Sequence, residues 1–111
     1  MKLQHRELYE LHAEVCKALA NPKRLMIIAL LSEGEKSVGE IVEAIHCPPA
    51  NVSQHLRVLR SRLLVESRKE GQTVYYRLTD ERLPAACSQI RSILLEGMKR
   101  RGKAARAYDR A

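Results

Sequence analysis

Apolar residues recur at intervals of three and four along the first part of this chain, which is the spacing of amphipathic helices. Residues 4–20 follow this spacing through five apolar positions, Leu8, Leu11, Val15, Ala18 and Leu19. Residues 22–33 are apolar almost all round and predict a buried central helix. Asn21 is the expected N-cap of that helix, Pro22 its first residue and Gly34 its end.

Two further helices are predicted from residue 37 onward. Ser37, followed three residues later by Glu40, has the spacing of a capping box and starts a short third helix. A Cys-Pro-Pro turn at residues 47–49 leads into a fourth helix, predicted over residues 49–62. The apolar positions of this fourth helix share one face and are expected to be buried: Val52, Leu56, Leu59 and Leu63.

The pattern then changes to that of short β-strands. Residues 63–69 and 73–78 predict two strands joined at residues 70–72. A last helix is predicted over residues 80–99, and residues 100–111 predict a frayed basic tail. The expected fold is mainly α with a small β-hairpin, in the order ααααββα. Two helices joined by a tight turn and followed by a hairpin indicate a winged helix-turn-helix.

Charge narrows the class of partner. The formal net charge is +7 and the pI is about 9.7, so a polyanion is expected, either nucleic acid or an anionic membrane face. The longest apolar run, residues 25–31, is far shorter than the roughly 18 to 20 residues that span a bilayer. No membrane partner is therefore expected.

The three cysteines are an odd number and show no paired spacing, so they do not make a disulfide framework. A reducing cytoplasm is therefore the expected compartment.

The fourth helix has the character of a recognition helix, which enters the major groove of double-stranded DNA with its N-terminal half. Opposite its apolar face it carries side chains that can bond to base edges, namely Asn51, Ser53, Gln54, His55 and Arg57. Further along lie two residues for which phosphate is the expected partner, Arg60 and Arg62.

The hairpin is expected to supply a second contact with DNA, on phosphates or in the minor groove. Its candidate residues are Arg68, Lys69 and Gln72, and Ser37 is a further candidate at the start of the third helix. Glu66 and Glu70 dilute the positive charge of the hairpin, which argues against simple coating of phosphate.

Other functions remain open at this point. The polar face of the fourth helix could be merely solvated, or the domain could bind a protein instead of DNA. A thiol enzyme, with Cys16 or Cys87 as nucleophile and a histidine as base, is a third alternative. The sequence contains no glycine-rich phosphate loop, paired catalytic carboxylates or nucleophile elbow, so an enzyme is not expected.

Three stretches resemble one family of regulators. The runs KALANPKRLMIIALL, SVGEIVEAI and NVSQHLRVLRSRLLVESRKEGQTVYYRLTD are similar to the arsenic- and zinc-responsive repressors of the ArsR/SmtB family. The resemblance covers about residues 8–98. It implies a bacterial or archaeal homodimer that represses transcription at an inverted-repeat operator and is released by an effector.

This resemblance gives each segment an expected role within a single domain, residues 1–111. The helices at 4–20 and 80–99 would form the dimer, and their apolar stripes agree with that role. The helix-turn-helix would occupy residues 37–63 and the wing residues 64–79. Many relatives begin the recognition helix with a Ser-Gln-Ser type sequence, whereas this chain has Pro-Pro-Ala at 48–50. Base reading is therefore expected to shift to Asn51, Ser53, Gln54 and His55.

The sensor sites known in this family are not reproduced here. The stretch at 38–42 lacks the thiols of a Cys-Val-Cys site, and the last helix has no histidine, so no zinc site is expected. Cys47 is expected to pack in the turn. No cofactor is expected, although a thiol-reactive effector or arsenite could act at Cys16 and Cys87. A cross-subunit metal site of His5, His12 and Cys16 is a weaker alternative.

Overall fold

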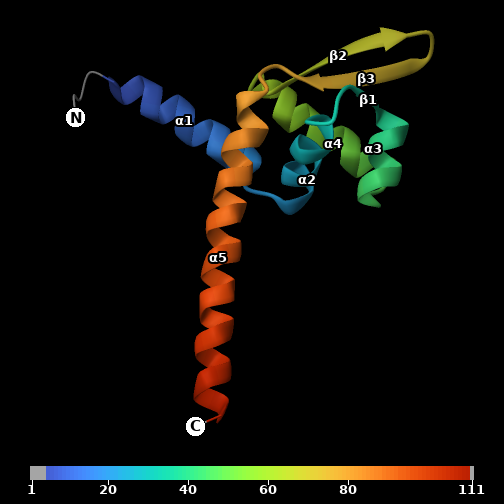
Figure 1. The fold of residues 1–111 in the computed structure, drawn as a ribbon. Coiled ribbons are helices and arrows are strands. Elements are labelled where there is room, and N and C mark those ends of the chain that lie inside the picture. Colours follow the sequence, from blue (N-terminus) through green and yellow to red (C-terminus); the bar gives the residue numbers. More distant parts are fainter. Residues whose placement is uncertain (1–4, 111) are drawn as a thin grey trace. The chain divides into compact units, whose positions relative to one another are not determined.

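The computed structural model describes residues 5–110 of the chain, and the side chains of residues 5–102. These residues form two compact units, one ending at Glu81 and one beginning at Arg82. The first unit contains helices α1 (Arg6–Leu19), α2 (Pro22–Leu31), α3 (Val38–Ile45) and α4 (Pro49–Ser61), with strands β1 (Lys36–Ser37), β2 (Val65–Glu70) and β3 (Thr73–Leu78). The second unit is a single helix, α5 (Arg82–Arg110) (Figure 1).

The start of α2 is fixed by the predicted cap. The side-chain oxygen of Asn21 accepts hydrogen bonds from the backbone N–H of Lys23 at 2.9 Å and of Arg24 at 3.2 Å. Pro22 is the first helical residue, where its missing N–H costs nothing. Gly34 follows the helix with φ of 134°, a conformation that side chains with a Cβ rarely adopt.

A capping box starts α3, as the sequence predicts. The backbone N–H of Glu40 donates to the Ser37 hydroxyl at 3.1 Å, and the Glu40 carboxylate accepts from the backbone N–H of Ser37 at 2.9 Å. The same hydrogen bonds lower the pKa of Glu40, because they favour its charged form. His46 ends α3 in the left-handed conformation, with φ of 50°.

The core of the first unit lies between α2, α3, α4 and β2. Its side chains are fully or almost fully removed from solvent: Ile27, Ile28, Leu31, Ile41, Ile45, Val52, Leu56, Leu59 and Val65. The predicted burial of Leu63 is wrong, since this side chain is 79% exposed. The helix ends at Ser61, and Leu63 has φ of 58°, which takes it off the apolar stripe of α4.

Three antiparallel strands make the sheet, in the order β1-β3-β2. The sequence predicts only a hairpin, so the order ααααββα lacks β1. This strand is two residues long, too short to produce an alternating pattern. Strands β2 and β3 pair from Val65 opposite Leu78 to Glu70 opposite Thr73. They project beyond the helices of the first unit as the wing (Figure 1).

Helix α5 is longer than predicted, since it continues past residue 99 to Arg110. The basic stretch after residue 99 is rich in Ala, Lys and Arg, which favour helix, and one glycine costs only about 1 kcal/mol. The prediction of a frayed tail is therefore wrong for the backbone up to Arg110. The side chains beyond residue 102 lie outside the described part of the chain.

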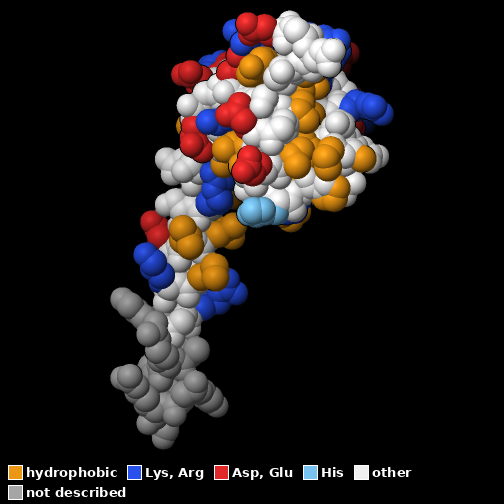
Figure 2. All heavy atoms as spheres, turned by 90° about the vertical axis from the view of Figure 1, so that its right-hand side faces the viewer, with side chains coloured by type: hydrophobic (Ala, Val, Ile, Leu, Met, Phe, Trp, Pro, Cys, Tyr) orange, Lys and Arg blue, Asp and Glu red, His pale blue; other side chains and the backbone are white. Residues whose placement is uncertain are grey.

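Apolar side chains line the described surface of α5 (Figure 2). Ile90 is 60% exposed and Leu94 is 56% exposed, and three further apolar residues are also open to solvent, Ile93, Leu95 and Met98. Helix α1 likewise exposes Leu8 and Leu11. Exposed apolar stripes of this kind are typical of surfaces that associate with another molecule. Along residues 5–102 no helix is long and apolar enough to cross a membrane.

Candidate nucleic-acid interface

Helix α4 is held by one face and presents the other to solvent. Val52, Leu56 and Leu59 are fully buried against the rest of the first unit. The side chains on the opposite side are exposed, as the sequence predicts: Asn51, Ser53, Gln54, Arg57 and Arg60. These side chains offer amide, hydroxyl and guanidinium groups, which suit base edges and phosphates.

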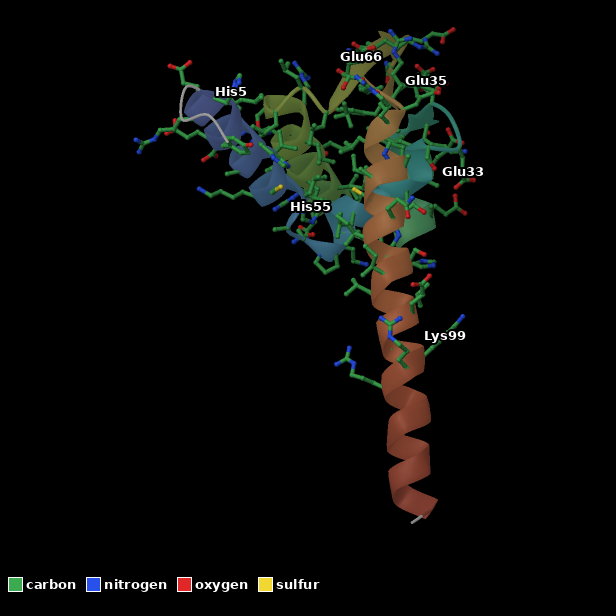
Figure 3. All side chains as sticks on the ribbon, turned by 60° about the vertical axis from the view of Figure 1, so that its left-hand side comes forward. His5, Glu33, Glu35, His55, Glu66 and Lys99 are labelled. Atoms are coloured by element: carbon green, nitrogen blue, oxygen red, sulfur yellow. The ribbon has the colours of Figure 1, made fainter. Side chains whose placement is uncertain are left out.

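His55 is less exposed than the sequence predicts. His55 lies on α4 (Figure 3), and its ring is half-buried. Nη1 of Arg24 on α2 lies 3.3 Å from its Nδ1. Burial lowers the pKa of His55, and the nearby charges of Arg24 and Lys23 lower it further. The neutral form of the ring is therefore favoured, and in it Nδ1 accepts from Arg24, because a guanidinium can only donate. Its other nitrogen, Nε2, carries the hydrogen and can only donate.

This neutral histidine should make the stability of the protein depend on pH. Because the pKa of His55 is lower in the folded state, the unfolded chain takes up the proton first as the pH falls. The contribution of the neutral ring to stability is fully present above the pKa of an unfolded histidine, about 6.5. It decreases as the pH falls below that value. We expect the thermal midpoint of His55→Gln to fall less than that of the parent between about pH 7.5 and 5.5.

The control for this measurement is His12→Gln, on the exposed surface of α1. It should follow the parent across the same pH range. An equal fall for His55→Gln and the parent would contradict a neutral, partly buried His55.

Arg62 at the end of α4 contacts another helix of the protein. Its Nη2 lies 3.0 Å from Oε2 of Glu14 on α1. The sequence predicts a phosphate contact for Arg62, but this guanidinium already has a carboxylate partner. The pair links α1 to the last turn of the candidate recognition helix.

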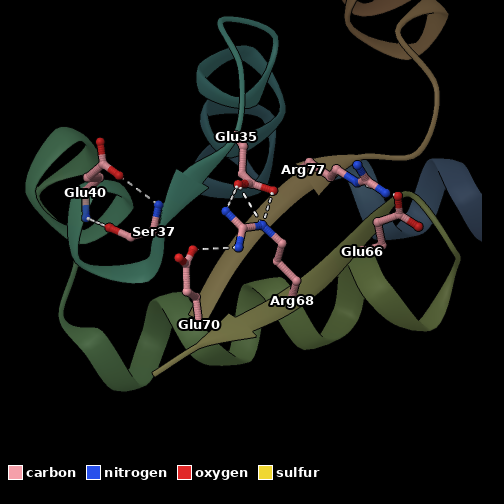
Figure 4. Close-up of polar contacts among 7 residues, drawn as sticks. All are labelled: Glu35, Ser37, Glu40, Glu66, Arg68, Glu70 and Arg77. Carbon is pink, nitrogen blue, oxygen red and sulfur yellow. Dashed lines mark hydrogen bonds and ion pairs between the residues drawn. The ribbon is translucent and has the colours of Figure 1, made fainter. Parts of the chain in front are cut away.

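The wing divides its charges between two faces, since side chains alternate along a strand. On one face lie Glu66, Arg68 and Glu70 of β2, beside Arg77 and Tyr75 of β3. The carboxylates and arginines of this face neutralise one another. Arg77 Nε lies 2.6 Å from Oε1 of Glu66 (Figure 4).

Arg68 is the most extensively paired side chain of the wing. Its guanidinium donates to Glu35, just before β1, with a shortest distance of 2.6 Å, and to Glu70 at 2.8 Å (Figure 4). It also stacks over the ring of Tyr75, with its Cζ 4.6 Å from the ring centroid. The hydrogen bonds that Arg68 donates to Glu35 and Glu70 raise the pKa of Arg68, and they lower that of Glu35.

Arg68 therefore acts within the protein and is less available to phosphate than the sequence predicts. Glu35 was not singled out from the sequence. It lies 33 residues from Arg68, and no local pattern links the two. The ion pair between Arg68 and Glu35 links the edge strand β2 to the segment that precedes β1.

The other face of the wing carries its available positive charge. Lys69 lies on this face with Ser67 and Tyr76, and residues 5–102 provide no carboxylate partner for it. Glu66 and Glu70 point to the opposite face, so they dilute the charge around Lys69 less than the sequence predicts. Gln72 is exposed in the turn that joins β2 to β3.

The predicted effector residues differ in accessibility. Cys16 on α1 is exposed, whereas Cys87 on α5 is 6% exposed, and Cys47 is buried in the turn before α4. All three are free thiols. Within the described part of the chain, no three His, Cys, Asp or Glu side chains gather closely enough to hold a metal ion.

The chain is similar to known bacterial regulators of transcription. Residues 21–67 match the model of the arsR family of bacterial regulatory proteins. The chain is 42% identical over 86 residues to the transcriptional activator HlyU of Vibrio cholerae, a match that covers 77% of this chain and 80% of that protein.

A second relative is longer than this chain. The HTH-type transcriptional repressor SmtB of Mycobacterium tuberculosis is 40% identical over 78 residues, covering 70% of this chain. The match spans only 58% of the length of that repressor. Among solved structures, a homodimeric winged helix-turn-helix DNA-binding domain from Mycobacterium bovis superposes with a TM-score of 0.77 and 33% identity. That match covers 90% of this chain and 93% of the other.

Proposed function

This chain belongs to the arsR family of helix-turn-helix transcriptional regulators, and we propose that it binds double-stranded DNA as a homodimer and represses transcription. The observation that carries the proposal is the exposed face of α4. Three of its side chains, Asn51, Gln54 and Arg57, are exposed opposite a fully buried stripe. The amides of Asn and Gln match adenine, and the guanidinium of Arg suits either guanine or a backbone phosphate.

The apolar surfaces of α1 and α5 support a homodimer. Leu8 and Leu11 on α1, with Ile90, Leu94 and Met98 on α5, are exposed in a single chain. A twofold dimer that covers them would repeat α4 once per subunit. The operator would then be an inverted repeat, with its half-sites about 34 Å apart.

Binding to duplex DNA should depend on salt, and the structure distinguishes two cations of the wing. Lys69→Ala should reduce the slope of log Kd against log salt concentration by about 0.9 per subunit, the loss of one phosphate contact in each. Arg68→Ala should reduce it less, because its guanidinium is already paired with Glu35 and Glu70. Fluorescence anisotropy of a labelled duplex at several KCl concentrations measures both slopes. A larger effect of Arg68→Ala would contradict this view of the wing.

The same titration separates the competing functions. A domain that binds only another protein, or a thiol enzyme, should show no salt-dependent affinity for a duplex. Failure of the parent protein to bind any duplex at low salt would overturn the proposal.

We further propose that a thiol-reactive effector relieves repression at Cys16 and Cys87, without a bound cofactor. Both thiols are free, and Cys16 is exposed. The double variant Cys16→Ser, Cys87→Ser should remain on DNA when tetrasulfide, peroxide or arsenite releases the parent. If none of these reagents releases the parent, or if the variant responds equally, the two thiols are packing residues.

A further inference from the structure

A shallow hollow of about 410 Å³ lies between the recognition helix and the wing. It is lined by five residues, Ser53, Arg57, Arg60, Ser61 and Tyr76. Four of them come from successive turns of α4 and one comes from β3. The recognition helix and the wing thus both contribute to one depression of the surface.

The lining of this hollow has the chemistry of a phosphate site. It combines two guanidinium groups with three hydroxyl groups, and no carboxylate lines it. Arg57 forms no ion pair within residues 5–102. Arg60 reaches only the hydroxyl of Ser67, at 3.5 Å, so its charge is not neutralised. The Ser61 hydroxyl donates to the carbonyl oxygen of Val58 at 2.6 Å, which leaves the hydroxyls of Ser53 and Tyr76 beside the two guanidinium groups. Guanidinium and hydroxyl donors suit the oxygens of a phosphate.

The position of the hollow indicates where such a phosphate would come from. Tyr76 lies on the same face of the wing as Lys69, away from the Glu35–Arg68–Glu70 group. A recognition helix occupies the major groove, and a wing contacts the neighbouring minor groove or its phosphates. The sugar-phosphate strand that separates these two grooves must cross the space between helix and wing. The four α4 residues of the hollow are exposed, so a continuous strand can reach it.

We propose that this hollow binds one backbone phosphate of the DNA strand between the two grooves, with Arg57 and Arg60 on the same phosphodiester. The proposal rests on the proposed DNA-binding function. Such a contact carries no sequence information, but it fixes how far α4 enters the groove and in which register. A free phosphate ion offers the same chemistry and is the alternative source that the test must separate.

The test uses the full-length protein and a labelled duplex of random sequence. The parent, Arg57→Gln, Arg60→Gln and the double variant are titrated at several KCl concentrations. Because both arginines contact one phosphate, each single variant and the double variant should lower the salt slope by at most about 0.9 per subunit. Two separate phosphates would give a loss of about 1.8 per subunit in the double variant.

Arg62→Gln is the matched control, since it lies on the same helix but is paired with Glu14. It should keep the parent slope. Tyr76→Phe should weaken binding less than either arginine variant while leaving the slope unchanged, because it removes a hydroxyl and no charge. The variants all replace partly or fully exposed residues and should remain folded, which circular dichroism and thermal unfolding can check.

A second arm uses inorganic phosphate as the probe, followed by calorimetry and by the NMR signals of the arginine side chains. We expect no saturable binding at millimolar phosphate. Saturable binding that the double variant loses would assign the hollow to a free ion and overturn the DNA proposal. An unchanged salt slope in the double variant, a loss of about 1.8 per subunit, or an equal effect of Arg62→Gln would each overturn it too. In those cases the parent still binds DNA, whereas failure of the proposed function leaves the parent without duplex binding.

Discussion

The double substitution Ile90→Glu, Leu94→Glu is expected to convert the protein to a monomer and to weaken operator binding by about 10²- to 10⁴-fold. Both side chains are exposed on α5 in the single chain. Two charges there would have to be buried in the proposed dimer without partners, which is strongly unfavourable. A monomer also binds only one half-site and loses the gain that comes from linking two recognition helices.

Sedimentation velocity measures the mass, and anisotropy with an inverted-repeat duplex measures the affinity. Ser92→Glu is the control, since residue 92 lies about 160° around the helix from residue 94. That variant should remain dimeric and bind as the parent does. A parent that sediments as a monomer at micromolar concentration, or a double variant that keeps full affinity, would contradict the dimer.

Gln54→Ala is expected to reduce discrimination at one base pair of each half-site by about 1 to 3 kcal/mol, roughly 5- to 150-fold. The amide of Gln54 is exposed in the N-terminal half of α4, the part that enters the major groove. Asn51→Ala should act at a neighbouring base pair. Neither change should alter the salt slope, since no charge is removed.

Competition with duplexes that carry single base-pair changes measures this discrimination. Gln89→Ala, the same substitution on the exposed surface of α5, is the control and should leave the preference intact. If Gln54→Ala retained the full preference of the parent at every position, α4 would have to be turned differently in the groove.

The elements that the sequence predicts well are those determined by neighbouring residues. Asn21 and Ser37 start their helices through hydrogen bonds to residues two or three positions away, so their short motifs were sufficient. The stripe of Val52, Leu56 and Leu59 depends only on helical spacing, and it is buried as predicted.

The errors arise where geometry departs from a simple repeat. Leu63 continues the apolar spacing of α4, but the chain leaves the helix after Ser61 and turns this side chain into solvent. Strand β1 is too short to carry a pattern. Helix α5 extends past residue 99 because a single glycine does not stop an alanine-rich helix.

The properties of the candidate interface depend on contacts between distant segments. The pairing of Arg68 with Glu35 joins residues 33 positions apart, and that of Arg24 with His55 joins residues 31 apart. The four residues can be read in the sequence, but the pairing of such distant residues cannot. The sequence therefore offers Arg68 and Lys69 alike as DNA contacts, whereas the folded wing keeps Lys69 available on one face and neutralises Arg68 on the other.

The most direct test of the central claim is selection of the parent protein on a pool of random duplexes at moderate salt. If α4 reads bases in a twofold dimer, repeated rounds should enrich an inverted repeat with half-sites about one helical turn apart. The Asn51→Ala, Gln54→Ala variant should lose that enrichment while still retaining DNA. Enrichment of no sequence by the parent, or of the same sequence by the variant, would contradict the assignment of α4 as the recognition helix.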